Sequence, residues 1–192
     1  MKVPVRKHFL EHQSVIEQSI DALEAEAEEV GRVLVEALRA GNKIIAFGNG
    51  GSATQASHLV GELMGRYSLT RQPFPAVALA GDAGTVTCIA NDFGYDVLFE
   101  RQVQALVVPG DVAIGYTTSG RSENVRLGLL KARERGAVTI AVTGAAGLIG
   151  AAADHMLSVP STITAYVQEV HLMLLHVWCI YIDAELGEAQ SE

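Results

Sequence analysis

Two polar residues one helical turn apart offer the clearest candidate chemistry in this sequence. His58 and Glu62 lie four positions apart in residues 52–66, a segment whose pattern predicts a helix. Side chains at i and i+4 project from the same helix face, so we expect the imidazole and the carboxylate to be neighbours. Such a pair suits half of a zinc site or a general base, although a surface hydrogen bond is the commoner outcome of this spacing.

A second polar pair lies in the last predicted helix, residues 163–186. Gln168 and His176 are eight residues apart, which is about 80° around the axis at 3.6 residues per turn. The two side chains can therefore share one face, but a neutral amide is a weak metal ligand and the spacing alone does not select it. The other histidines of this region, His155 and His171, are expected to be structural.

Two loops rich in glycine and hydroxyl groups indicate an anion site. Residues 117–122 read TTSGRS and residues 49–52 read NGGS, and each loop follows a predicted strand and precedes a predicted helix. Backbone N–H groups, hydroxyls and helix N-termini together bind phosphate. Helix capping is the simpler explanation of either loop alone. No lysine follows the loop glycines and no GxGxxG pattern occurs, which argues against a nucleotide cofactor.

The elements that must position these residues follow from the apolar pattern. Short apolar runs predict five strands, at residues 43–47, 76–79, 112–116, 138–142 and 155–159. Helical spacing predicts helices at residues 6–40 (one helix, or two with a break near 26–29), 52–66, 84–106 with a break at 91–95, 122–135, 147–153 and 163–186. Strands that alternate with helices predict an α/β fold with a parallel sheet covered on both faces. Ligands bind at the carboxyl ends of such strands, where both loops fall.

Length and composition limit the classes of protein that fit. The 192 residues suit one domain, with N-terminal helices over residues 1–41 and an α/β core over residues 42–187. A net charge of −8 with scattered Lys and Arg argues against a nucleic-acid partner. The N-terminus has no signal-peptide core, and the apolar run at residues 171–182 is too short to span a membrane. Cys88 and Cys179 have apolar neighbours and are expected to be buried thiols, which favours a cytoplasmic location.

The motifs together resemble one known family. The segment GNGGS at residues 48–52 and the loop TTSGRS resemble the two signature segments of SIS domains, which bind phosphosugars. Further segments resemble the phosphoheptose isomerase branch, in the family's order from about residue 8 to 184: ANDFGY (90–95), FERQVQAL (99–106), PGD (109–111), VPS (159–161) and VQEVH (167–171) followed by His176. The resemblance implies a single SIS domain with a five-stranded parallel sheet of Rossmann or flavodoxin-like type and an N-terminal helical extension.

The resemblance also assigns residues. It implies one zinc ion per subunit, held by His58, Glu62, Gln168 and His176. It implies Glu62 as the base at carbon and His176 as the acid and base for the oxygen protons. It implies substrate contacts from Asn49, Gly50, Gly51, Ser52, Glu62, Asn91, Asp92, Thr117, Thr118, Ser119, Ser122 and Gln168. It implies a homotetramer with active sites at subunit interfaces, which agrees with the surplus of apolar helix surface in this chain.

The implied reaction converts D-sedoheptulose 7-phosphate into D-glycero-D-manno-heptose 7-phosphate through an enediol(ate), the first step of the bacterial ADP- and GDP-heptose pathways that supply lipopolysaccharide. Two alternatives stay open: a non-catalytic SIS protein that binds a replication initiator, and an isomerase of another phosphosugar in secondary metabolism. The non-catalytic relatives lack the carboxylate that Glu62 supplies here. Three residues depart from the usual pattern: Gln55 stands where Asp is usual, Thr117 replaces Ser, and Tyr166 replaces a basic residue.

Overall fold

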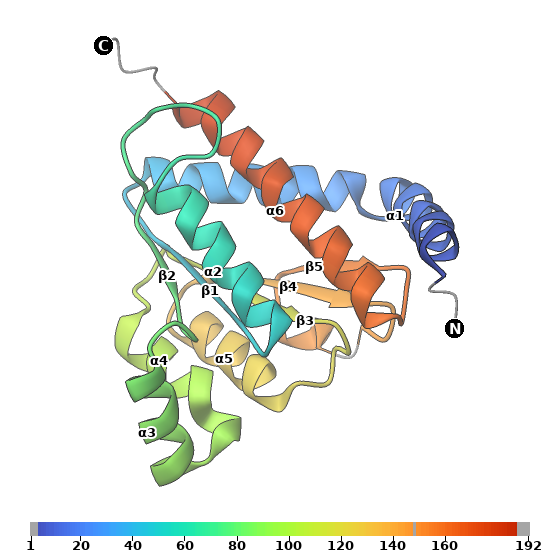
Figure 1. Ribbon diagram of the computed structural model, residues 1–192. Coiled ribbons are helices and arrows are strands. Elements are labelled where there is room, and N and C mark those ends of the chain that lie inside the picture. The colour runs from blue at the N-terminus through green and yellow to red at the C-terminus, as the bar shows by residue number, and fades with distance from the viewer. Residues whose placement is uncertain (1–3, 148, 188–192) are drawn as a thin grey trace.

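A computed structural model describes residues 4–147 and 149–187 of the chain, in which strands and helices alternate (Figure 1). The elements in chain order are α1 (Val5–Arg39), β1 (Ile44–Gly48), α2 (Gly51–Met64), β2 (Ala76–Ala78), α3 (Ala83–Phe93), the short 3-10 helix η1 (Tyr95–Val97), α4 (Leu98–Leu106), β3 (Val112–Thr117), α5 (Glu123–Glu134), β4 (Val138–Gly144), the 3-10 helix η2 (Gly150–Ala152), β5 (His155–Val159) and α6 (Thr164–Leu186). The predicted strands and the longer predicted helices are present within a few residues of their expected bounds, whereas the stretch 147–153, whose residue 148 lies outside the described residues, holds only the 3-10 helix η2.

The five strands form one parallel sheet in the order β2-β1-β3-β4-β5. This is the flavodoxin-like order, in which the chain first winds to one side of β1 and then crosses to β3 on the other side. The crevice between the carboxyl ends of β1 and β3 is therefore the topological switch point, where such sheets bind their ligands. The Asn49–Ser52 and Thr117–Ser122 loops lie at these two strand ends, so the sheet brings together the two loops that the sequence singled out.

Helices cover both faces of the sheet. Figure 1 shows α1, α2 and α6 on one side and α4 and α5 on the other. The side chains of β1 alternate between the two layers: Ile44 and Ala46 belong to the core under α1, α2 and α6, whereas Ile45 and Phe47 belong to the core under α4 and α5. The inner strands β1, β3 and β4 are buried on both faces and are therefore mostly apolar, which is the pattern that predicted them, whereas the edge strands β2 and β5 are only partly buried.

The N-terminal helix α1 runs through 35 residues without the break that was considered near residues 26–29. Its buried positions follow helical spacing and include Leu23, Val30, Leu34 and Leu38. These side chains belong to the same apolar core as α2 and α6. The helix is thus held by packing along its length rather than by capping, since the residue before it makes no side-chain cap.

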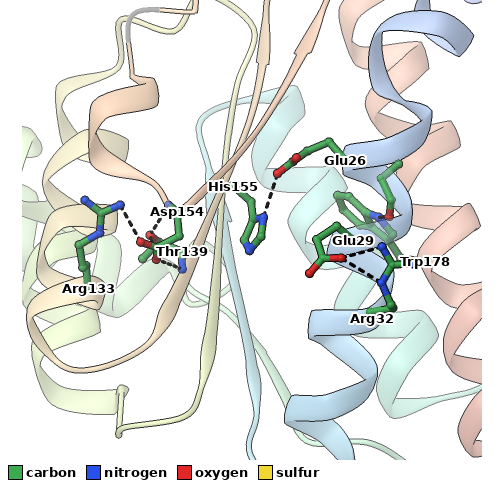
Figure 2. A network of polar contacts seen from close by, with 9 residues as sticks. Glu26, Glu29, Arg32, Arg133, Thr139, Asp154, His155 and Trp178 are labelled. Atoms are coloured by element: carbon green, nitrogen blue, oxygen red, sulfur yellow. Dashed lines mark hydrogen bonds and ion pairs between the residues drawn. The ribbon is translucent and has the colours of Figure 1, made fainter.

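Polar contacts tie the edge of the sheet to its neighbours (Figure 2). His155 on β5 lies 2.8 Å from Glu26 of α1, through Nδ1 and Oε1. Asp154 accepts from Thr139 N and Oγ1 at 2.9 and 2.7 Å and from Arg133 at 2.8 Å. The Trp178 indole on α6 donates to the backbone oxygen of Ala27 at 3.2 Å. His155 is therefore a structural edge residue, as predicted.

Two expectations about single segments need revision. Cys88 was expected to be buried, but it is exposed, because α3 lies beside the sheet and has no buried residue. Cys179 on α6 is buried as predicted. Although the run at residues 171–182 is short, α6 is long and apolar enough to cross a membrane by length and composition, and its 18-residue apolar stretch has a mean hydropathy of 1.2. Half of that 18-residue stretch is buried in this fold, where α6 packs on α1 and α2 as a core helix does.

Candidate functional site

The Thr117–Ser122 loop places several hydroxyl groups at the carboxyl end of β3. Thr117 Oγ1 lies 3.0 Å from Ser122 Oγ, and Ser119 Oγ accepts from the backbone N–H of Arg121 at 3.2 Å. Ser122 precedes α5, yet its side chain makes no capping hydrogen bond to that helix. The simpler capping explanation therefore does not apply to Ser122, and the hydroxyls and the helix N-terminus remain available to an anion.

The Asn49–Ser52 loop turns directly into α2. Gly50 has a φ of 56°, a left-handed conformation that favours glycine, and precedes the first residue of the helix without a side-chain cap. The Asn49 side chain is held in place, because it exchanges two 2.9 Å hydrogen bonds with Asn124 and accepts a third from Tyr95 at 2.8 Å. The loop is thus ordered by residues of α5 and η1 from the other side of the switch point.

His58, Glu62 and His176 come together in the structure. His58 Nε2 lies 3.0 Å from Glu62 Oε1 and 3.4 Å from His176 Nε2, and the three ligand atoms all lie within 4.8 Å of one another. Tyr67 stacks on the His176 ring at a centroid distance of 5.6 Å. Two imidazole nitrogens and a carboxylate that converge on one point form a donor set that fits zinc with a coordination position left open. We call these three residues the His–Glu–His cluster.

Gln168, the fourth expected ligand, lies elsewhere on the shared face of α2 and α6. Its amide packs against the start of α2, so that a Cβ on Gly51 would come 2.5 Å from Gln168 Nε2. His58 is seven residues further along α2, which is about 10 Å at 1.5 Å per residue. In this chain Gln168 therefore borders the glycine loop, whereas His176 lies about two turns further along α6, in contact with His58.

The remaining expected contacts are exposed or face other elements. Asn91 and Asp92 are exposed on α3, where the Asn91 amide donates to Asp92 Oδ1 at 2.7 Å. Tyr166 is buried against α1: its hydroxyl donates to Glu11 at 2.8 Å and its ring stacks on His12. The Glu11 carboxylate, helped by burial, raises the pKa of the Tyr166 hydroxyl. The departure at Tyr166 therefore changes a contact with α1.

His171 is a structural residue, as expected. The ring is fully buried and its Nε2 lies 3.3 Å from the backbone oxygen of Thr143. Burial lowers the pKa of His171 to about 4, only partly offset by the backbone contact, so the ring is neutral at physiological pH. A neutral ring with Nε2 as its donor fits this contact, and His171 takes no part in proton transfer.

Sequence patterns did not reveal several residues that shape the site. The side chains of Asn124 and Tyr95 hydrogen-bond to that of Asn49, although they are 75 and 46 positions away in the sequence. No local motif signals such pairings. Gly144 ends β4 next to the Thr117–Ser122 loop, where a Cβ would come 2.5 Å from the backbone oxygen of Thr118. Its place after a predicted strand was the one available signal. Arg71 donates to the backbone oxygens of Glu62 and Leu63, both at 3.0 Å, and so holds the end of α2 that carries the carboxylate.

The parallel sheet of this order and the two loops at its switch point agree with a SIS domain, and the model of the SIS domain family matches residues 7–144. The phosphoheptose isomerase of Aquifex aeolicus is 45% identical over 185 residues, which cover 96% of this chain and 97% of that protein. The structure of the phosphoheptose isomerase GmhA from Neisseria gonorrhoeae has a TM-score of 0.88 at 38% identity and covers 94% of this chain and 97% of its own. The enzyme from Francisella tularensis has a TM-score of 0.90 at 32% identity, with 94% and 96% covered. The chain belongs to the phosphoheptose isomerase family of SIS domain proteins.

Proposed function

We infer that this chain is a sugar-phosphate isomerase that converts D-sedoheptulose 7-phosphate into D-glycero-D-manno-heptose 7-phosphate. The observation that carries this inference is the His–Glu–His cluster, because a phosphosugar-binding protein without chemistry has no need for two imidazoles and a carboxylate in contact. Membership of a family whose relatives carry the name phosphoheptose isomerase over nearly their whole length supports the same substrate.

The reaction moves one proton from C1 of the ketose to C2, and the residues of the cluster divide this work. Glu62 takes the C1 proton and returns it to C2, while His176 moves the proton between the two oxygens of the enediol(ate). The hydroxyl-rich loop, Thr117–Ser122, binds the phosphate, and Asn49–Ser52 together with Gln168, Asn91 and Asp92 binds the sugar. The phosphate thereby fixes the reacting carbons relative to the base.

The cluster also suits a zinc ion, which His58, Glu62 and His176 would hold, whereas the Gln168 amide lies against Gly51 and not beside these three donors. A bound metal supplies Lewis-acid stabilisation of the oxygen on which negative charge develops. Metal binding and proton transfer compete for Glu62, because a carboxylate that holds a metal is a weaker base. Two carboxylate oxygens resolve this competition, since one can ligate while the other accepts the proton.

A panel of phosphosugars tests the proposed function. Purified zinc-loaded protein is incubated with sedoheptulose 7-phosphate, fructose 6-phosphate or ribulose 5-phosphate, and the aldose formed is followed by NMR. We expect kcat/KM to be highest for sedoheptulose 7-phosphate. Faster turnover of fructose 6-phosphate or ribulose 5-phosphate would show that the enzyme is specific for that sugar instead. No turnover of any of the three sugar phosphates would favour the non-catalytic alternative.

Removal of the metal is expected to abolish activity. Dialysis against a chelator removes the Lewis acid, and added zinc restores turnover if the cluster is the metal site. His58→Ala is expected to lower the zinc bound per chain, measured by elemental analysis. His155→Ala is the matched control, because His155 pairs with Glu26 outside the cluster. Full activity of the metal-free protein, or equal zinc loss in both variants, would contradict the assignment.

We propose that the chain assembles as a homotetramer with its sites at subunit interfaces. An open apolar groove of about 330 Å³ runs between α1 and α6, lined by residues that include Ile20, Met173 and Val177. These side chains are 56%, 44% and 39% exposed, and α1 and α6 are the longest helices among the residues described. A second copy of α1 and α6 covers such a surface. The free cysteines fit a cytoplasmic location for this assembly.

Sedimentation measures this assembly directly. We expect the protein to sediment as a tetramer and Met173→Glu to sediment as a smaller species, because the charge is placed in the groove. Leu130→Glu serves as the control, since Leu130 is similarly exposed on α5 at the other face. A monomeric wild-type protein would contradict the proposal.

A further inference from the structure

Gln55 makes an unusual contact where α2 packs against α6. The side chain is 9% exposed, and its Nε2 donates to the backbone oxygen of Gln168 at 2.5 Å, across 113 positions of sequence. Its Oε1 is buried and has no hydrogen-bond partner among the residues that the structure describes. The Gln55 side chain is thus hydrogen-bonded to the backbone of Gln168 through its N–H, while its own oxygen is buried without a partner among the described residues.

A residue with only a packing role would not be expected to keep this arrangement. The backbone oxygen of an interior helical residue already accepts an N–H within its own helix, so the bond from Gln55 is an additional one. An unpaired buried oxygen costs stability, and an apolar side chain of the same length would avoid that cost. A buried unpaired group therefore calls for an explanation beyond packing.

The same contact holds one of the residues of the candidate site. The Gln168 side chain lies against Gly51, at the start of α2, where only the absence of a Cβ leaves room for the amide. Gln55 is one turn further along α2, and its side-chain amide donates a hydrogen bond to the backbone oxygen of Gln168. The Gln168 backbone is thus bonded to Gln55 of α2, and the Gln168 amide lies against Gly51 of the glycine loop.

We propose that Gln55 is a positioning residue, which fixes the first turns of α6 so that the Gln168 amide borders the sugar site. The proposal rests on the proposed function, in which Gln168 contacts the substrate. It requires a side-chain donor at position 55, because the backbone oxygen of Gln168 is an acceptor, and the Gln55 amide N–H is that donor. An ionised carboxylate at position 55 has no N–H and would face that oxygen with a like partial charge.

A double-mutant cycle tests this role. Gln55→Met keeps the length of the side chain and removes the donor, and it is combined with Gln168→Ala. We expect Gln55→Met alone to lower kcat/KM for sedoheptulose 7-phosphate about 5- to 30-fold, the effect of one displaced contact. In the Gln168→Ala background the same change is expected to have less than a twofold effect, because residue 168 no longer has an amide to position. Equal losses in both backgrounds would overturn the proposal.

Two further measurements separate positioning from general damage. Gln102→Met removes a side-chain bond to the helix oxygen of Leu98, far along the chain in α4, and is expected to leave kcat/KM unchanged. The side-chain amide signal of Gln168 in 15N NMR, identified by its loss in Gln168→Ala, is expected to shift in Gln55→Met and not in Gln102→Met. An unshifted signal would overturn the proposal even if the wild-type protein acts on no heptose, whereas inactivity of the wild type alone counts only against the proposed function.

Discussion

Glu62→Gln is expected to lower kcat for sedoheptulose 7-phosphate by about 10²- to 10⁴-fold, the usual contribution of a general base. Glutamine keeps the shape of the side chain and its contact with His58, which lies 3.0 Å away, but it cannot accept a proton from C1. Because the fold does not depend on this charge, the variant is expected to remain folded. Turnover is measured at saturating substrate, so that a change in binding does not mimic a change in chemistry.

The zinc content and a His–Glu pair outside the cluster, His155 with Glu26, supply the controls for this variant. Zinc content is measured in parallel, because glutamine is a weaker ligand than a carboxylate and metal loss would also lower kcat. Glu26→Gln alters the carboxylate that faces His155 and is expected to keep kcat at the wild-type value. A zinc-loaded Glu62→Gln protein that retains more than a tenth of the wild-type kcat would show that another residue is the base.

Arg71→Met is expected to lower the free energy of unfolding by about 3–5 kcal/mol, measured by chemical denaturation, because it leaves a buried carboxylate without its partner. Arg71 Nε donates to Asp183 Oδ1 at 2.7 Å, and the two side chains are 1% and 4% exposed. Asp183→Leu added to Arg71→Met is expected to recover part of the loss, since the unpaired charge is then gone. Arg32→Met, which breaks an exposed pair with Glu29, is expected to change stability far less.

The same ion pair predicts how stability responds to acid. Burial raises the pKa of Asp183, but hydrogen bonds from Arg71, Ser68 and Leu69 outweigh it and hold this pKa below its usual range. A carboxyl with a lowered pKa in the folded state stabilises the protein above its unfolded pKa of about 3.9, and this contribution is lost as the pH falls through the folded value. We therefore expect the stability of the wild type to fall below about pH 4, and this part of the decline to be absent in Asp183→Leu. An unchanged acid limb in that variant would contradict the role of Asp183.

Local pattern was sufficient for the elements of the fold. The inner strands β1, β3 and β4 are mostly apolar because they are buried on both faces. The pattern also predicted β5 (His155–Val159) to the residue, although this edge strand exposes Met156. The order of the strands is a different matter, since alternating strands and helices fit several orders. The family resemblance implied a five-stranded parallel sheet of Rossmann or flavodoxin-like type, and the pairing of β1 with both β2 and β3 shows that the order is the flavodoxin-like one.

The candidate site was only partly accessible from the sequence. Helical spacing placed His58 beside Glu62, because i and i+4 neighbours meet wherever the helix packs. It could not bring His176 to them, because that contact joins two helices 118 positions apart. The exposure of Cys88 was missed for a related reason: apolar neighbours in sequence say nothing about whether α3 has a sheet to cover.

Long-range polar contacts were the least predictable feature. Arg71 and Asp183 lie 112 positions apart, and the residues around each of them in the sequence form no recognisable motif. The two side chains nevertheless form a buried ion pair at the end of α2. Tyr166 stands where a basic residue is usual in the family, and no local pattern indicated that its hydroxyl would bond to Glu11 of α1. Side chains of this kind are placed by the packing of whole helices, which a single sequence does not reveal.

The central claim is that one sugar phosphate lies with its phosphate at Thr117–Ser122 and its C1 and C2 carbons at the His–Glu–His cluster. A crystal structure of the zinc-loaded Glu62→Gln protein with sedoheptulose 7-phosphate tests this claim most directly. We expect the phosphate within hydrogen-bonding distance of the loop hydroxyls and backbone N–H groups, and C1 and C2 in contact with residue 62 and His176 of the same or a neighbouring subunit. A sugar bound in the reverse direction, or away from both the loop and the cluster, would contradict the account.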